Sequence, residues 1–190
     1  MKFFLDENNV DKYLEMVTDY DPSFMVQQVR NYASDGSTLL ELGMGGGTDL
    51  VALSNYYQVV GSDYSLLFIE KFQKRYPQIR TELVDAIQMN ISGTFDCIYS
   101  NKVLQHLTRK DFITSLQNQK KHLNKDGIIF MTLWRGEHKE EMMYDESIRF
   151  TYYLEEDILN IVADNYEVMS LETYDELEVD DSLLVVLKVK

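Results

Sequence analysis

The sequence predicts an α/β fold: a doubly wound, mostly parallel sheet with an antiparallel hairpin at its C-terminal end. Between residues 38 and 134, short apolar runs alternate with amphipathic segments of helical period, which is typical of parallel strands joined by helices. The first of these runs leads into a glycine-rich turn that begins at Gly43. Two longer strand-like runs, separated by an acidic turn, close the chain and predict the hairpin.

The elements follow in chain order. Behind Asp6, apolar residues recur at i, i+3, i+4 and i+7 as far as Val17 and predict an amphipathic helix. Asp21-Pro22 has the pattern of a cap followed by proline in the first helical turn, so a second helix is expected to begin there. The alternating region predicts strands over residues 38–42, 58–61, 81–84, 95–100 and 127–134, and helices over residues 48–56, 65–76 and 109–123. A helix over residues 155–164 and strands over residues 166–174 and 182–189 follow.

Composition limits the function classes. The chain has 190 residues and one cysteine, Cys97, so its size suits one domain and an internal disulfide is excluded. Its formal net charge is −14, from 32 acidic and 18 basic residues, which disfavours nucleic acid and anionic membranes as partners. No apolar run approaches the roughly 20 residues that cross a bilayer. The start of the chain becomes acidic at Asp6, too early for a signal peptide, and a cytoplasmic location is expected.

The glycine-rich turn indicates a nucleoside site. Residues 39–48 read LLELGMGGGT, and Asp63 follows at the end of the next apolar run. A dinucleotide fingerprint, G-x-G-x-x-G, requires its third glycine at position 48, where Thr48 stands. Glu41 would repel a pyrophosphate but attract an amino group. S-adenosylmethionine, a nucleoside that carries an amino acid and no phosphate, therefore fits these residues better than NAD does.

Five segments in this order resemble the motifs of the class I S-adenosylmethionine-dependent methyltransferases. They are residues 39–47, 59–65, 84–86, 95–107 and 123–129. The resemblance covers about residues 10 to 190. It implies a Rossmann-like methyltransferase sheet of about seven strands, with the cofactor at the carboxyl ends of the central strands. It also implies methyl transfer to an acceptor by in-line displacement, with S-adenosylhomocysteine as the second product.

The resemblance also implies a set of cofactor-binding residues. Glycines let the backbone pass close to the methionine portion of the cofactor, and Glu41 would anchor its amino group. Asp63 is expected to bind the ribose hydroxyls, Tyr64 to offer a ring face to adenine, and Asp85 to accept from the adenine amine. The candidates are Glu41, Gly43, Gly45, Gly47, Asp63, Tyr64, Asp85, Ala86 and Asn101. The structural alternatives are a flexible turn for the glycines, a satisfied strand-end carboxylate for Glu41 and a loop cap for Asp85.

We expect a single methyltransferase domain over residues 1–190. Its parts are a helical cap (1–34), a cofactor-binding core (35–134), a lid segment (135–153) and a terminal helix with the hairpin (154–190). The lid segment is rich in aromatic residues and methionine, and no large inserted domain is present, so a small-molecule acceptor fits better than a macromolecule. Tyr13, Trp134 and Tyr153 are the candidates for the acceptor pocket.

The sequence indicates catalytic residues less specifically than it indicates cofactor-binding residues. Residues 100–103 read SNKV, not the (N/D/S)-P-P-(Y/F/W) tetrapeptide of amino-directed nucleic acid methylases. Cys97 follows Asp96 within a strand, which does not suit a covalent cytosine mechanism. His106 is the nearest candidate for a general base, with packing against the cofactor pocket as the alternative.

No metal-ligand spacing stands out, and no metal is expected. Two other function classes stay open: a non-catalytic S-adenosylmethionine-binding or scaffold protein, and a nicotinamide- or flavin-dependent oxidoreductase.

Overall fold

The computed structural model describes residues 3–144 and 147–190. Residues 1–2, at the start of the predicted cap, and residues 145–146, in the predicted lid, lie outside the described residues. Within the described chain, no helix has the length and apolar character needed to cross a membrane.

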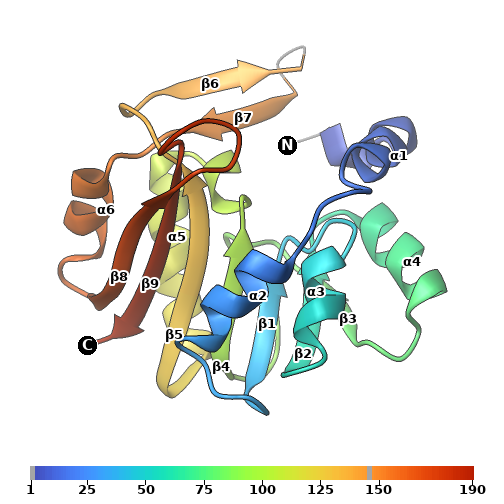
Figure 1. Cartoon of the computed structure of the whole chain (residues 1–190), viewed down its shortest axis with the longest axis horizontal. Helices are drawn as coiled ribbons and strands as arrows, with labels where there is room; N and C mark the ends of the chain where they lie inside the picture. Colours follow the sequence, from blue (N-terminus) through green and yellow to red (C-terminus); the bar gives the residue numbers. More distant parts are fainter. Residues whose placement is uncertain (1–2, 145–146) are drawn as a thin grey trace.

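A seven-stranded sheet has the order β3-β2-β1-β4-β5-β9-β8 (Figure 1). Its strands are β1 (Thr38–Leu42), β2 (Gln58–Asp63), β3 (Thr81–Leu83), β4 (Phe95–Asn101), β5 (Leu123–Trp134), β8 (Tyr166–Tyr174) and β9 (Ser182–Val189). The pairs from β3 to β5 are parallel, whereas β9 pairs antiparallel with β5 and with β8. The predicted fold class, a doubly wound and mostly parallel sheet with a C-terminal antiparallel hairpin, is confirmed.

Six helices are described: α1 (Glu7–Met16), α2 (Ser23–Arg30), α3 (Thr48–Leu53), α4 (Leu66–Arg75), α5 (Arg109–Gln119) and α6 (Glu155–Val162). Short 3₁₀ turns occupy Phe3–Leu5, Leu104–His106 and Lys120–His122. The predicted Asp6 cap forms, since its side chain accepts a hydrogen bond from the Asn9 amide. At the second helix the N-cap position is Pro22 and not Asp21, and the helix begins at Ser23, whose amide donates to Asp21. Both bonds satisfy amides that lack a partner within their helix.

Helices cover both faces of the sheet because successive strand residues alternate between the faces. On one face, α2 and the end of α3 pack on alternate residues of the central strands, among them Leu39, Cys97 and Phe130. On the other face, α5 and α6 pack on β5 and β9. The strand order reverses between β1 and β4, and open α/β sheets bind ligands at the carboxyl edge of such a point.

The largest difference from the prediction lies in the lid segment. Residues 135–153 contain a second sheet, the hairpin of β6 (Glu140–Met143) and β7 (Ile148–Thr151). In Figure 1 this hairpin lies beyond one end of the main sheet, and the amino-terminal segment lies near it at the same end. The hairpin was not expected because β6 is mostly exposed and lacks the alternation of a half-buried strand.

Smaller differences concern element ends. Helix α3 stops at Leu53 and α5 at Gln119, and β5 begins at Leu123, four residues before the expected start. Asp126 has φ +66° and lies next to the register shift of the β4–β5 pair. Because this turn-like residue lies within a continuous strand, the predicted start of the strand was placed too far along the chain.

Candidate cofactor and acceptor site

A cavity of about 1490 Å³ opens at the carboxyl edge of the sheet. The ends of β1, β2 and β4 contribute its floor. Its walls come from residues 3–4, helix α1, the β6–β7 hairpin and the loop between β8 and β9. Segments from both ends of the chain therefore meet around the site.

The glycine loop after β1 forms one wall. Gly43, Gly45 and Gly47 all have positive φ, between +50° and +77°, a region that side chains rarely adopt. A Cβ on Gly45 would lie 3.2 Å from the Tyr13 ring, whereas a Cβ on Gly47 would collide with Phe72 of α4. Gly43 and Gly45 line the cavity, and Gly47 does not. Gly47 is therefore required by the packing of the loop on α4.

Asp63, at the end of β2, fastens the glycine loop. Its carboxylate accepts hydrogen bonds from the amides of Gly45 (3.0 Å) and Ser65 (2.8 Å). Burial raises its pKa to about 6, against the lowering effect of these backbone bonds. The carboxylate lines the cavity and has more lone pairs than these bonds use, so it can still accept from a diol.

Asp63→Asn should weaken binding of S-adenosylmethionine by about 1.5–3 kcal/mol, the range for hydrogen bonds to a charged group. The variant should also melt at a lower temperature, because an amide cannot accept from both backbone N–H groups. Calorimetry and thermal melts measure the two effects.

Asp96→Asn is the matched control. Asp96 also accepts from a backbone amide, that of Thr38, but at the start of the strands. The Asp96→Asn variant should lose stability and keep the parental affinity for the cofactor. Equal affinities of the Asp63 variant and the parent would contradict a ribose-binding role for Asp63.

Two further carboxylates lie buried beneath the loop. Glu41 faces the same side of the sheet as Tyr99 of β4, its register partner, and Asp49 of α3 accepts from the Tyr99 hydroxyl (2.7 Å) and the Asn101 amide (3.0 Å). Glu41 Oε2 and Asp49 Oδ1 have no hydrogen-bond partner among the described residues. Burial is the main cause that raises the pKa of both, and neighbouring carboxylates add to it. Unpaired buried carboxylate oxygens of this kind fit a cation.

Asn101 acts inside this network. Its amide group donates to Asp49 and to the Tyr20 hydroxyl (3.1 Å), and its carbonyl oxygen accepts from Thr132 (2.5 Å). Both ends of the side chain are thus used by the protein, and Asn101 orients Asp49.

Residues at the ends of β2 and β3 form another part of the cavity. Tyr64, Asp85 and Ala86 line it. Asp85 Oδ1 accepts from the amides of Ile87 (2.7 Å) and Gln88 (3.3 Å), so the side chain caps its loop. The second carboxylate oxygen remains as an acceptor for an amine.

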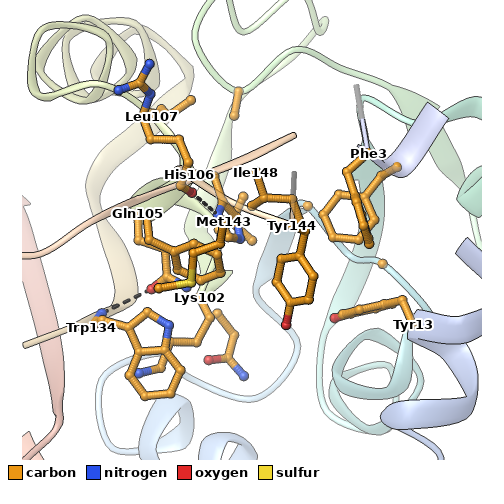
Figure 2. A pocket seen from close by; sticks show the side chains of 18 of the residues that line it. Phe3, Tyr13, Lys102, Gln105, His106, Leu107, Trp134, Met143, Tyr144 and Ile148 are labelled. Carbon is orange, nitrogen blue, oxygen red and sulfur yellow. Dashed lines mark hydrogen bonds between the residues drawn. The ribbon is translucent and has the colours of Figure 1, made fainter. Parts of the chain in front are cut away.

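His106 and Trp134 lie on the other side of the cavity, with Tyr13 and Tyr144 across from them (Figure 2). His106 Nδ1 is 2.7 Å from the carbonyl oxygen of Arg149 on β7. A carbonyl oxygen can only accept, so Nδ1 carries the proton and Nε2 bears a lone pair. Burial lowers the pKa of His106 below its ordinary value of 6.5, against the effect of the Arg149 bond. Burial therefore favours the neutral imidazole.

Tyr153 was predicted to line the acceptor pocket, but it does not line the cavity. It is fully buried in the core, where its ring packs on Phe112 with centroids 5.1 Å apart. Its neighbour Tyr152 lines the cavity instead. Neighbouring residues of an extended segment point in opposite directions, and the sequence alone did not fix which tyrosine points inward. Glu41 also lies below the cavity and not in its wall.

Lys102 was not predicted. It has φ +56°, and its Nζ lies 3.0 Å from Glu176, 3.3 Å from the Leu133 carbonyl oxygen and 2.5 Å from the Ser182 hydroxyl. It also lies 3.5 Å from the centroid of the Trp134 ring. Burial lowers the pKa of Lys102 to about 8, against the effect of Glu176. All three ammonium protons have partners, so Lys102 ties the β8–β9 loop to the cavity. The pattern SNKV gave no signal of this role.

Comparisons with known proteins fit this arrangement. Residues 39–127 match the family model of a methyltransferase domain. This match indicates a methyltransferase domain in this part of the chain. It agrees with the predicted family, class I S-adenosylmethionine-dependent methyltransferases, and a solved structure with the same fold holds S-adenosylmethionine. No curated protein matches the chain.

Solved structures share the fold of this methyltransferase at low sequence identity. A 1,6-didemethyltoxoflavin-N1-methyltransferase from Burkholderia thailandensis has a TM-score of 0.79 and 12% identity, with 96% of this chain and 84% of that chain covered. The N-methyltransferase NodS from Bradyrhizobium japonicum has a TM-score of 0.72 and 16% identity, with 99% and 95% covered. An S-adenosylmethionine-dependent methyltransferase from Clostridium acetobutylicum has a TM-score of 0.76 and 12% identity, with 94% and 98% covered.

Proposed function

We propose that this methyltransferase acts on a small-molecule acceptor that the chain itself encloses. The observation that carries the proposal is the cavity of about 1490 Å³ shared by the glycine loop and the β6–β7 hairpin. Sites for one small ligand usually measure about 300–1,000 Å³, so this cavity has room for the cofactor and an acceptor together. The neighbours that act on 1,6-didemethyltoxoflavin and on a glycopeptide add support for acceptors other than nucleic acid.

Each part of S-adenosylmethionine is assigned to residues of matching chemistry. Glu41 and Asp49 lie beneath the loop and do not line the cavity, so their unpaired buried oxygens would attract the methionyl ammonium group through water. Asp63 would bind the ribose, and Tyr64, Asp85 and Ala86 would bind adenine. When bound, S-adenosylmethionine supplies a methyl group activated by the sulfonium sulfur.

The chain's own residues then have two tasks. They align the acceptor, and alignment of this kind can lower a barrier by about 7–11 kcal/mol. They also accept a proton. The nitrogen or oxygen of an N–H or O–H acceptor would form a bond to the methyl carbon and lose its proton to the protein, while the electron pair of the broken carbon–sulfur bond stays on sulfur. His106 Nε2 is the base in this proposal, because its lone pair is free to receive that proton. Trp134 and Tyr13 would wall the acceptor, with the ammonium of Lys102 fixing the indole ring.

A screen tests the acceptor class. The protein is incubated with methyl-labelled S-adenosylmethionine and either a library of aromatic amines, heteroaromatics and phenols, or a mixture of tRNA, DNA and proteins. Label transfer to a compound of the first set alone supports the proposal. Transfer to a macromolecule alone would contradict it.

The role of His106 is tested with His106→Asn, whose amide nitrogen can keep the bond to the Arg149 carbonyl oxygen. Turnover of the acceptor found in the screen should fall by about 10²–10⁴, the range for general base catalysis. In the parent, kcat/KM should decline as the pH falls through a pKa below 6.5, because the protonated imidazole cannot accept a proton. The variant should lack this decline. A variant that keeps both the decline and the parental kcat would show that His106 only packs against the pocket.

A further inference from the structure

The 3₁₀ turn Leu104–His106 brings two polar side chains to the same cavity. Both Gln105 and His106 line it, and they follow β4 directly. Figure 2 shows the two hydrogen bonds that fix them, from the Trp134 amide to Gln105 and between His106 and a backbone carbonyl group. Backbone groups of two flanking segments therefore hold both side chains in one orientation.

The amide of Gln105 has only one possible orientation. Its Oε1 is 3.0 Å from the Trp134 backbone nitrogen. A backbone N–H can only donate, so the oxygen faces β5 and the NH₂ group faces away from it. Gln105 is 1% exposed, and its NH₂ group has no hydrogen-bond partner among the described residues, although it is not among the fully enclosed polar atoms. The remaining access is to the cavity that Gln105 lines.

The two neighbours thus present complementary groups. Gln105 offers two N–H donors, and His106 offers the lone pair of Nε2. Because the NH₂ group is open to the cavity, a ligand with an acceptor at this point can form a hydrogen bond to it. Apolar and aromatic side chains on the hairpin, Met143, Tyr144 and Phe150, also line the cavity and suit a flat molecule.

We propose that Gln105 and His106 form a donor–acceptor pair that selects acceptors whose nucleophilic N–H lies next to a carbonyl oxygen or ring nitrogen. Lactam-type heteroaromatics have such an edge. The neighbouring oxygen or nitrogen accepts from Gln105 while the N–H donates to His106, which fixes the nucleophile before transfer. Gln105 is a specificity-determining residue in this proposal, which rests on the proposed function.

The test compares two bicyclic probes on the protein saturated with S-adenosylhomocysteine. Quinazolin-4(3H)-one has the N–H and carbonyl edge, whereas 1-naphthol has a hydroxyl without a neighbouring acceptor. Ligand-observed NMR titrations should show at least about tenfold tighter binding of the quinazolinone, since a site built to pair a polar group strongly rejects an analogue that lacks it. Gln105→Glu keeps an acceptor for the Trp134 amide and removes the donors, and Gln105→Met removes both functions. Each should reduce the preference to about threefold or less while S-adenosylhomocysteine affinity stays within about threefold of the parent.

The outcomes separate the two proposals. Failure of the parent to bind S-adenosylhomocysteine would overturn the proposed function. Normal binding of S-adenosylhomocysteine overturns only the inference on Gln105 if both probes bind equally, if neither binds, or if both variants keep the parental preference. The use of two variants guards against a single substitution that does not fold.

Discussion

Gly45→Val should abolish binding of S-adenosylmethionine and leave the domain folded. Gly45 has φ +50°, and a Cβ on it would lie 3.2 Å from the Tyr13 ring. Valine would therefore press against Tyr13 of α1 and deform the edge of the loop that the methionine portion of the cofactor is expected to approach. Backbone strain at this φ adds about 1–3 kcal/mol of destabilisation. Calorimetry measures the lost binding, and circular dichroism with thermal melts measures the retained fold.

Gly36→Val is the matched control. Gly36 has φ +87° in the turn before β1, and a Cβ there would meet nothing within 4 Å. The substitution causes comparable strain without entering the cavity. It should lower the melting temperature and leave cofactor affinity unchanged. If both valine variants bind the cofactor like the parent, the glycine loop is a structural turn only.

The double variant Glu41→Gln, Asp49→Asn should bind S-adenosylmethionine at least about a hundredfold more weakly, or about 2.7 kcal/mol. The unpaired buried oxygens are expected to attract the ammonium group through water, and hydrogen bonds to charged groups contribute about 1.5–3 kcal/mol. 5′-Methylthioadenosine lacks the amino acid portion and serves as the control ligand. The variant and the parent should bind it equally.

The same variant should not lose stability at high pH. The pKa values of Glu41 and Asp49 are raised in the folded protein, so between their unfolded and folded values the native state binds more protons. The unfolding free energy therefore falls as the pH rises through this window. Neutral amides remove this loss, and the variant should be at least as stable as the parent at pH 8 in urea titrations. Loss of stability together with unchanged cofactor affinity would make the two acids structural.

The strands and helices could be predicted from the sequence because buried parallel strands are continuous apolar runs and the helices have a regular period. The β6–β7 hairpin could not, since its pairing depends on tertiary contacts such as that between His106 and Arg149. The orientation of Tyr152 and Tyr153 depends on the same pairing.

The site was predictable where local backbone chemistry determines it. Short sequence motifs predict the positive φ of Gly45 and the position of Asp63 at a strand end. Asp49, Gln105 and Lys102 gave no such signal, because their roles arise from partners on distant segments, namely Tyr99, the Trp134 amide and Glu176. A buried glutamine or lysine becomes informative only when its partners are known.

Calorimetric titration of the chain with S-adenosylmethionine at pH 6, in two buffers of different ionisation enthalpy, tests the central claim most directly. One molecule should bind per chain with release of protons. Burial raises the pKa values of the carboxylates, that of Asp63 to about 6, and a bound cation lowers them again because it favours the ionised form. NAD should not bind. Absence of S-adenosylmethionine binding, or binding without proton release, would contradict a site built on these buried carboxylates.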